Sequence, residues 1–377
     1  MRNTALGFGV LGSLQMTANG TLVPLGAPKQ RAVLAMLVIN RNRPVSVESL
    51  IDAVWDQWPV PAARTSIHSY VSNLRRLLGT AGVDPHTVLA NAPPGYQLSV
   101  ADADCDLGRF ITEKTAGVHA AAAGRFEQAS RHLSAALAEW RGPVLDDLRD
   151  FAFVDAFATV LLEDKVAAHT ARAEAEIACG RANAVIGELE ALTAKHPYRE
   201  PLWAQLITAY YVAERQSDAL DAYRRLETTL AENLGIDPGP TVSALHARIL
   251  RQEPLDAKRA AQTTAKHSVI DLDSHTAVAS QSAVAGLRDT AGRRYRLHAV
   301  TTRIGRLPDN DIVLDDDDVS RHHAVIIDTG TGFVITDLRS TNGVEVQGQR
   351  IRTSTTLADG DHIRIGGHEF TFEIRPR

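Results

Sequence analysis

The spacing of the apolar residues changes twice along this sequence, and no single fold accommodates all three patterns. The first hundred residues mix short alternating runs with helical stripes. Residues 104–252 are rich in Ala, Leu and Glu with helical periodicity, and the last ninety or so alternate with period two. Period two is typical of half-buried strands, and period 3.6 of amphipathic helices. Because 377 residues are also many for one hydrophobic core, we predict several domains in series.

The N-terminal hundred residues predict strands, then helices, then a hairpin. "GFGVLGSLQMTANGTLVPLG" alternates around Asn19-Gly20, a dipeptide that favours the positive φ angles of a two-residue turn. "PKQRAVLAMLVIN", "SVESLIDAVWDQW" and "AARTSIHSYVSNLRRLLG" (62–79) predict three helices, the first starting at Pro28 and the last closed by Gly79. "VLANAPPGYQLSV" (88–100) predicts two short strands.

The third helix has an apolar stripe and an opposite polar face. The stripe comprises Ile67, Tyr70, Val71, Leu74, Leu77 and Leu78. The polar face and its flanks comprise Arg64, Thr65, His68, Ser69, Ser72, Asn73, Arg75 and Arg76. Short hydrogen-bonding side chains can read base edges in a major groove, while arginines neutralise phosphates. A solvated face is the alternative for a lone helix, but the position after two helices and before a hairpin favours DNA binding.

In this setting, "SYVSNLRRLLG" and "PPGYQL" resemble the recognition helix and the wing of the winged helix-turn-helix of OmpR-type response regulators. The charge distribution agrees with this resemblance. Residues 1–100 carry eight Lys and Arg against four Asp and Glu, whereas residues 104–252 carry 16 against 22. A basic module on an acidic chain indicates a local site for a polyanion. The resemblance implies that double-stranded promoter DNA is the partner.

A repeat is visible in the helical middle. "ANAVIGELEAL" (182–192) and "SDALDAYRRL" (217–226) align at Ala184 and Ala219, 35 residues apart, and "AAGRFEQASRHLSAALAEW" (122–140) opens in a similar way. Helix pairs of this length are typical of tetratricopeptide-like repeats, which bury their apolar faces by stacking. Joined to a winged helix, the segment resembles the bacterial transcriptional activation domain of SARP-type actinobacterial regulators. A plain helical spacer is the alternative. RNA polymerase is a further candidate partner.

We predict domain boundaries where the composition changes. The winged helix is expected at 1–103, the tetratricopeptide-like domain at 104–252, a linker at 253–283 and a β-sandwich at 284–377. The linker is rich in Ala, Thr and Ser, and one short strand is expected there at "SVIDL" (268–272). The sandwich follows from many short period-two runs, the last two joined by Gly366-Gly367.

Within the sandwich, an acidic run of four aspartates (315–318) lies between Arg306 and Ser320-Arg321. These flanking cations and the hydroxyl suit an anionic ligand. "RIGR" (303–306), "SRHH" (320–323) and "STNG" (340–343) resemble, in order and spacing, the three motifs of the forkhead-associated domain. This resemblance implies a phosphothreonine site formed by Arg306, Ser320, Arg321, Thr341 and Asn342. It also implies that His323 supports the binding loop without touching phosphate, and that Gly305 and Gly343 serve backbone turns.

These residue types suit the implied ligand. A phosphothreonine brings nearly two negative charges and several acceptor oxygens. Arg306 can offer a charged fork, Ser320 a hydroxyl donor and Arg321 a second cation. The amide of Asn342 can donate and accept, so it can hold the backbone of an extended peptide. The aspartates cannot hold phosphate, and we expect them to favour peptides with Lys or Arg near the phosphothreonine.

Other chemistries fit the sequence less well. "DNDIVLDDDD" lacks the alternate ligand positions, central Gly and closing Glu of an EF-hand, and the histidines have no metal-ligand spacing. "DTG" (328–330) imitates an aspartic protease but has no second such motif, so residues 328–332 are expected to form a turn. We find no P-loop, GxSxG or dinucleotide fingerprint. No metal, no cofactor and no enzymatic activity are expected.

The remaining features concern location. Cys105 and Cys179 are too few for a disulfide framework, nothing resembles a signal peptide, and the longest apolar run, "AVLAMLVI" (32–39), is too short to span a membrane. The sequence therefore predicts a cytoplasmic, membrane-independent transcription factor that docks a phosphorylated Ser/Thr kinase or another phosphothreonine protein. The alternative is a kinase-binding adaptor or inhibitor with little DNA-binding role.

Overall fold

The computed structural model describes residues 5–55, 60–279, 284–297, 301–307, 310–328, 333–338, 340–351 and 354–375. Contacts divide the chain into two compact units. The first unit comprises residues 1–109, 140–162 and 272–377, and the second comprises 110–139 and 163–271. Elements far apart in the sequence therefore fold together within each unit.

The chain begins with a small antiparallel sheet of strands β1 (Leu6–Gly9), β2 (Gln15–Ala18) and β3 (Thr21–Leu22). Asn19 and Gly20 connect β2 to β3 with φ angles of 49° and 79°. The predicted turn is confirmed, and it forms here because both residue types tolerate positive φ.

The three predicted helices and the hairpin follow. They are α1 (Pro28–Ile39), α2 (Val47–Trp55), α3 (Ala63–Thr80), a short α4 (Pro85–Val88), and a sheet of order β4-β6-β5 built from β4 (Val45–Ser46), β5 (Leu89–Ala92) and β6 (Gly95–Leu98). The prediction that Gly79 closes α3 is wrong. The helix continues to Thr80, and the left-handed turn falls at Gly82, with φ of 84°. A glycine inside the last turn is tolerated when the reversal follows it.

The apolar stripe of α3 faces the core of this region, as the sequence predicts. Ile67, Val71, Leu74 and Leu78 are buried, and they pack with buried side chains of α1 and α2 such as Leu37 and Leu50. Trp58, the last apolar position expected on the second helix, lies outside the described residues. The burial of one face of α3 leaves the opposite face exposed.

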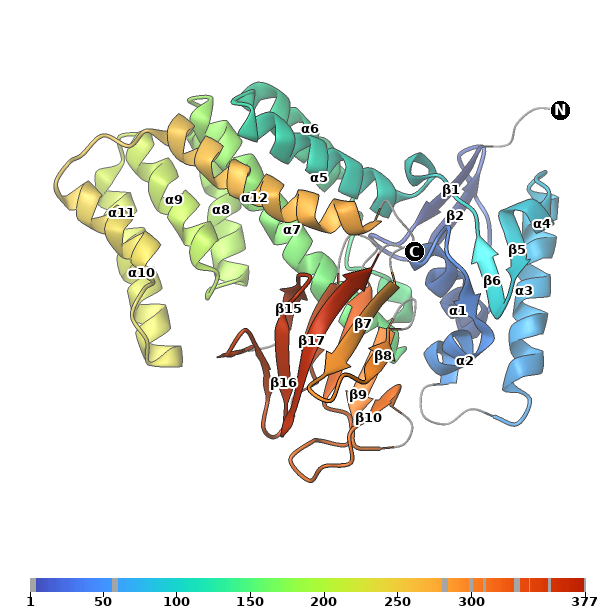
Figure 1. Ribbon diagram of the computed structural model, residues 1–377. Coiled ribbons are helices and arrows are strands. Elements are labelled where there is room, and N and C mark those ends of the chain that lie inside the picture. Colours follow the sequence, from blue (N-terminus) through green and yellow to red (C-terminus); the bar gives the residue numbers. More distant parts are fainter. Residues whose placement is uncertain are drawn as a thin grey trace. The chain divides into compact units, whose positions relative to one another are not determined.

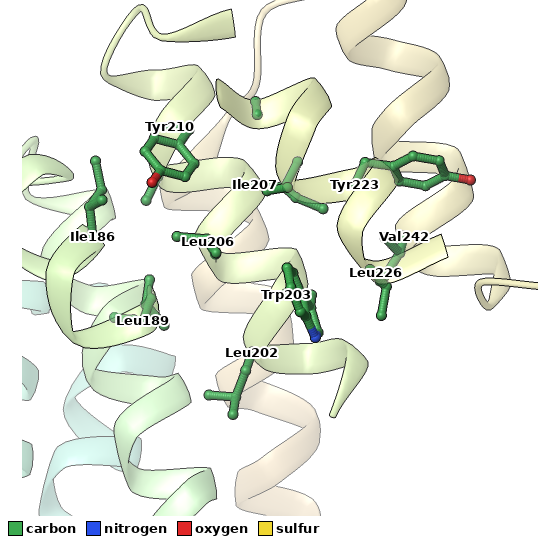
Figure 2. Close-up of a cluster of buried hydrophobic side chains, with 14 of the residues drawn as sticks. Ile186, Leu189, Leu202, Trp203, Leu206, Ile207, Tyr210, Tyr223, Leu226 and Val242 are labelled. Carbon is green, nitrogen blue, oxygen red and sulfur yellow. The ribbon is translucent and has the colours of Figure 1, made fainter. Parts of the chain in front are cut away.

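Helices dominate the middle of the chain, as predicted (Figure 1). They are α5 (Asp106–Ala122), α6 (Phe126–Ala138), α7 (Ala152–Ala178), α8 (Asn183–Lys195), α9 (Glu200–Val212), α10 (Gln216–Leu234) and α11 (Pro240–Leu250), with 3-10 turns η1 (Asp102–Asp104) and η2 (Asp146–Leu148). Figure 2 shows the core on α9, where Trp203, Leu206 and Ile207 lie between the flanking helices. Stacked helix pairs are therefore present.

The repeat itself has a different register from the one that the sequence alignment gives. Gly180 and Glu214 both have positive φ, and the residue after each, Arg181 or Arg215, donates its backbone N–H to the carbonyl five residues earlier. Four residues further on, Val185 and Ala219 are buried. The equivalent positions are thus 34 residues apart, and Ala184, which the sequence pairs with Ala219, is exposed. Ala184 and Val185 are adjacent apolar residues, and choosing the first of them shifts the sequence alignment by one position.

The segment expected to be a linker contains a long helix, α12 (Ala257–Ala279). The prediction of a short strand at residues 268–272 is wrong, because these residues belong to α12. Ala261 and Ala265 of α12 are buried, and the side-chain amide of Gln262 donates to the carbonyl of Ala122 at the end of α5, 3.1 Å away. An Ala-rich sequence has high helix propensity, and packing of its small side chains stabilises the helix further.

The C-terminal region is a sandwich of two sheets, as predicted. One sheet has the order β10-β9-β11-β12-β15 and the other β14-β13-β16-β17-β7-β8. The strands are β7 (Val284–Asp289), β8 (Arg294–Arg296), β9 (Thr301–Gly305), β10 (Ile312–Val313), β11 (Ala324–Asp328), β12 (Phe333–Asp337), β13 (Val344–Val346), β14 (Gln349–Arg350), β15 (Ser354–Leu357), β16 (His362–Ile365) and β17 (His368–Arg375).

Alternation along these strands points one side of each sheet into a shared core. Ile304, Ile326 and Ile335 of the first sheet meet Phe370 and Phe372 of the second. Gly366 and Gly367 join β16 to β17, which confirms that hairpin. β10 pairs in parallel with β9, an exception to the antiparallel pattern that we expected. The predicted turn at 328–332 falls mostly outside the described residues.

Candidate functional site

The residues assigned to phosphothreonine all lie on loops at one end of the sandwich strands. Arg306 follows β9, Ser320 and Arg321 precede β11, and Thr341 and Asn342 precede β13. Strands on both sheets therefore position the loops. The side chains of Arg306, Arg321, Thr341 and Asn342 are exposed, and Ser320 is half-buried.

The buried imidazole of His323 connects two of these loops. Its Nδ1 accepts a hydrogen bond from the backbone N–H of Ser320, at 3.0 Å, and its Nε2 lies 3.0 Å from the carbonyl oxygen of Gly343. Because Nδ1 accepts, Nε2 must carry the proton that is donated to the carbonyl. His323 therefore has the supporting position that the sequence implies.

Ser320 is the point where three loops meet. Its hydroxyl oxygen accepts the backbone N–H of Thr341 at 3.0 Å, and its carbonyl oxygen accepts the backbone N–H of Arg306 at 3.0 Å. The hydroxyl hydrogen takes no part in these two bonds, so it can donate to a ligand oxygen. Hydrogen bonds from their backbone N–H groups thus attach Arg306 and Thr341 to the same serine, Ser320.

The two glycines have different roles. Gly343 has φ of 78°, which agrees with the expected turn, and a Cβ atom there would be strained and would displace the guanidinium of Arg350, 2.2 Å away at Nε. Gly305 instead ends strand β9, and a Cβ atom there would lie 2.4 Å from the carbonyl oxygen of Arg321. A side chain at Gly305 would therefore push two loops apart.

The four aspartates differ in what they contact. Asp317 is fully exposed and forms an ion pair with Arg306 (Oδ1 to Nη1, 3.4 Å), while the carbonyl of Asp318 accepts the side-chain amide of Asn342 at 2.9 Å. Asp316 instead accepts the backbone N–H groups of Asp318 and Gly367, at 2.9 and 3.2 Å. These two bonds hold the pKa of Asp316 below its usual value. Asp316 therefore organises the loop, a role that we did not predict for it.

Asn310 is a second supporting residue that the sequence analysis missed. It is buried, and its amide nitrogen donates to the carbonyl oxygens of Leu307 and Arg321, at 2.9 and 2.8 Å. Its Oδ1 lies 3.2 Å from Nδ1 of His322. An amide in an otherwise charged loop is a signal that could have identified it, because only the amide both donates and accepts.

The polar face of α3 is exposed, but not all of its cations are free to face DNA. Arg64 pairs with Glu48, and the guanidinium of Arg75 donates to the carbonyl of Leu89 and to Oδ1 of Asn91, each at 2.9 Å. Arg75 therefore holds α3 against the hairpin. His68 lies 2.5 Å from the hydroxyl of Tyr96 on β6.

The other predicted side chains of this face differ in their local contacts. Thr65, Ser69, Ser72 and Arg76 are exposed and Asn73 is half-buried. The hydroxyl of Ser69 donates to the carbonyl of Thr65, at 3.0 Å, and Arg76 donates to Oδ1 of Asn73, at 3.4 Å. Such weak local bonds are easily exchanged for bonds to a ligand, so this set remains the predicted DNA-reading surface.

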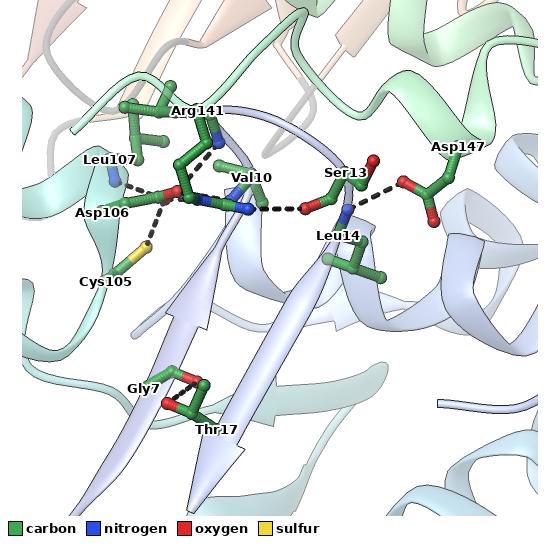
Figure 3. Close-up of polar contacts among 11 residues, drawn as sticks. Gly7, Val10, Ser13, Leu14, Thr17, Cys105, Asp106, Leu107, Arg141 and Asp147 are labelled. Carbon is green, nitrogen blue, oxygen red and sulfur yellow. Dashed lines mark hydrogen bonds and ion pairs between the residues drawn. The ribbon is translucent and has the colours of Figure 1, made fainter. Parts of the chain in front are cut away.

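A buried carboxylate lies between the start of α5 and the end of β1 (Figure 3). Asp106 accepts the backbone N–H groups of Val10, Leu11 and Leu107, at 2.7–3.0 Å, and pairs with Arg141 at 3.0 Å. An acidic residue in the first turn of a helix also interacts favourably with the helix dipole. Asp106 thus attaches the first strand to α5, and no sequence motif had indicated it.

The fold and the loop geometry define a multidomain regulator that combines a winged helix, a helical domain and a forkhead-associated sandwich. Family models agree: "Transcriptional regulatory protein, C terminal" matches residues 23–98, "Bacterial transcriptional activator domain" matches 105–250, and "FHA domain" matches 302–366. Each match lies within one predicted domain, although the boundaries themselves stay predictions.

Proteins of similar sequence and structure show which family of regulators this chain belongs to. The transcriptional regulatory protein EmbR of Mycobacterium tuberculosis is 73% identical over 370 residues, which cover 98% of this chain and 95% of that protein. MoaR1 of the same species is 53% identical over 67% of this chain and 81% of its own length. A solved structure of M. tuberculosis EmbR with a low-affinity phosphopeptide matches with a TM-score of 0.94, 72% identity, and coverage of 100% of this chain and 99% of that one. The chain belongs to the EmbR family of transcriptional regulators.

Among the described residues, none of the helices combines the length and apolar character needed to cross a bilayer. In the same part of the chain, no group of three or more His, Cys, Asp or Glu side chains is arranged to hold a metal ion.

Proposed function

We propose that this chain regulates transcription in response to a phosphothreonine protein, which its sandwich docks through Arg306, Ser320, Arg321, Thr341 and Asn342. The observation that carries the proposal is the junction at Ser320, whose hydroxyl oxygen accepts the backbone N–H of Thr341 and whose carbonyl oxygen accepts the backbone N–H of Arg306. The loops are held by hydrogen bonds before any ligand arrives, so little ordering would be required on binding. The phosphopeptide complex of the related EmbR supports this reading.

Each side chain has a distinct role in the proposal. Arg306 and Arg321 balance the phosphate charge, Ser320 donates its hydroxyl hydrogen to a phosphate oxygen, and the loop of Thr341 faces the phosphate. Asn342 holds the peptide backbone, for which its amide must leave the carbonyl of Asp318 or share it. Arg306 must likewise exchange Asp317 for phosphate. A fully exposed carboxylate at 3.4 Å is a weak competitor.

The partner in this proposal is a phosphorylated Ser/Thr protein kinase or another phosphothreonine protein. The exposed face of α3 would bind promoter DNA, and the helical domain would contact RNA polymerase. The protein would act in the cytoplasm, without enzymatic activity of its own. Kinase docking would in this way be coupled to transcription.

Calorimetry with the full chain tests the docking. One peptide sequence is compared with phosphothreonine, phosphoserine or threonine at the central position, and we expect saturable binding of the phosphothreonine form alone. Arg306→Ala should weaken that binding by roughly ten- to hundredfold, because a charge-assisted hydrogen bond contributes about 1.5–3 kcal/mol. Arg294→Ala, on the exposed edge strand β8, is the matched control. Equal binding of the threonine peptide would contradict the proposal.

A kinase-binding adaptor is the second candidate, and one observation favours it. Arg64 and Arg75 of α3 are both engaged within the protein, so fewer cations than expected can neutralise phosphates. Gel shifts at several salt concentrations separate the two functions. A DNA-binding regulator shows a steep salt dependence and prefers some promoter fragments, whereas an adaptor shows neither.

A further inference from the structure

The helical region contains a cavity of about 300 Å³, distinct from both surfaces described above. Its walls belong to α5, α7, α9 and α12, and α7 contributes the largest share. All of its lining residues lie in the second of the two compact units. The volume is at the lower end of the range for sites that bind small molecules, about 300–1,000 Å³.

The cavity exists because short side chains line these helices. Ala167, Ala171 and Ala175 of α7 and Ala265 of α12 line it. Alanine side chains let the backbones approach but cannot fill the remaining space. Gln262 fixes α12 in this position through its bond to the carbonyl of Ala122. Helix α12, which lies in the segment predicted to be a linker, is therefore one wall of the cavity.

One carboxyl group, that of Glu174 on α7, projects among these apolar walls. The side-chain amide of Gln205 donates to its Oε1, 3.0 Å away, and within the described part of the chain this is the one hydrogen bond that the structure gives it. The other charged residues that line the cavity are Glu163 and Arg199, and they form an ion pair with each other. Glu174 is half-buried, and its partner is neutral, whereas a carboxylate shielded from water is usually paired with a cation.

Burial among apolar side chains raises the pKa of Glu174 to about 8. A buried carboxyl group destabilises the fold unless it is protonated or meets a positive charge. Leu or Gln at this position would avoid that cost, so Glu174 is an unfavourable choice for packing alone. A ligand with a positive charge would compensate the negative charge of the ionised Glu174.

We propose that this cavity binds a small organic amine, whose ammonium group pairs with Glu174 and whose hydrocarbon body packs on the alanine walls. Anionic ligands are disfavoured because Glu174 would repel them as soon as its carboxyl group ionises. A neutral ligand would gain the apolar contacts but not the ion pair. The helical domain would thereby respond to a small-molecule ligand, independently of the phosphopeptide that binds the sandwich.

Binding must release a proton near neutral pH. The carboxyl group of Glu174 is mostly protonated at pH 7, and it has to ionise before it pairs with an ammonium ion that arrives already charged. The affinity should therefore rise by up to about tenfold per pH unit below pH 8 and level off above it.

The experiment uses three probes with the same ring: cyclohexylamine, cyclohexanol and cyclohexanecarboxylate. Calorimetry with the full chain at pH 8 should give saturable binding of cyclohexylamine, at least about tenfold tighter than cyclohexanol, and no binding of the carboxylate. At pH 7, the heat measured in two buffers should differ by the difference in their ionisation enthalpies, as the release of about one proton requires.

Three variants complete the test. Glu174→Gln keeps the shape of the side chain and should abolish both the preference for the amine and the proton release. Ala171→Leu fills the cavity, leaves Glu174 in place, and should abolish binding of cyclohexylamine and cyclohexanol alike. Glu232→Gln makes the same charge change on an exposed surface of α10 and should bind like the unmodified protein. Absence of cyclohexylamine binding, or equal binding by Glu174→Gln or by Ala171→Leu, would overturn the proposal.

Discussion

His323 and Gly343 are joined by a hydrogen bond of 3.0 Å, from Nε2 to the carbonyl oxygen, which connects two loops of the sandwich beneath the exposed site residues. We expect His323→Ala to weaken phosphopeptide binding although the side chain touches no ligand. The change leaves a buried carbonyl and a buried N–H without partners, each costing about 1–3 kcal/mol. Urea denaturation should show lower stability, and calorimetry weaker binding. His362→Ala, at an exposed position of β16, should change neither quantity.

The fully exposed Asp317 and its neighbour Asp315 should adjust peptide selectivity. Replacing both with Asn is expected to reduce the preference for phosphopeptides that carry Lys or Arg, because the attraction is electrostatic and screened by salt. The requirement for phosphate should remain. Calorimetry on matched basic and neutral phosphopeptides at two salt concentrations measures the effect. If the unmodified protein binds both peptides equally at low salt, these aspartates have no such role.

Asp316 should behave differently from its neighbours. Its folded-state pKa lies below the usual value because two backbone N–H groups bind the carboxylate, so the stabilisation is present above pH 4 and lost as the pH falls through the folded-state pKa. Asp316→Asn should therefore lower the urea midpoint at pH 7, and the difference from the unmodified protein should shrink towards pH 3. An equal midpoint at pH 7 would show that these bonds do not stabilise the loop.

The adjacent arginines of α3 offer a matched pair of variants. Arg76→Ala should weaken DNA binding on all sequences and reduce the salt slope by about one, as expected for a phosphate contact. Arg75→Ala should mainly lower stability, because its bonds to Leu89 and Asn91 hold the hairpin. Asn73→Ala should relax sequence preference if it reads a base. If none of the three variants changes DNA binding in gel shifts, α3 is not part of the DNA interface.

Asp106 is expected to be essential for attaching β1 to α5. Its carboxylate is buried and paired with Arg141, so Asp106→Ala removes the ion pair of a partly buried guanidinium and leaves several backbone N–H groups without their acceptor. Loss of one member of such a network costs about 3–5 kcal/mol. Thermal unfolding followed by circular dichroism would measure the loss. Asp104→Ala, exposed two residues earlier, is the control.

The sequence by itself determined the three regions of different secondary structure, and it predicted the ligand class of the sandwich. Short-range features carry this information: the alternation of apolar residues along β16 and β17, the Asn19-Gly20 turn, and the motif residues Arg306, Ser320 and Asn342. Period and turn chemistry depend on neighbours within a few residues, so they can be read without knowing what packs against them.

The tertiary structure decided what the polar side chains contact. Arg75 and Arg76 look equivalent in the sequence, yet only Arg75 meets the hairpin, and Asp316 differs from Asp317 because Gly367 comes close to it. Glu174 is one of many glutamates until α12 covers α7 and leaves a cavity beside it. Burial and the partners of a polar group arise from residues far away in the chain, and these distances exist only after folding.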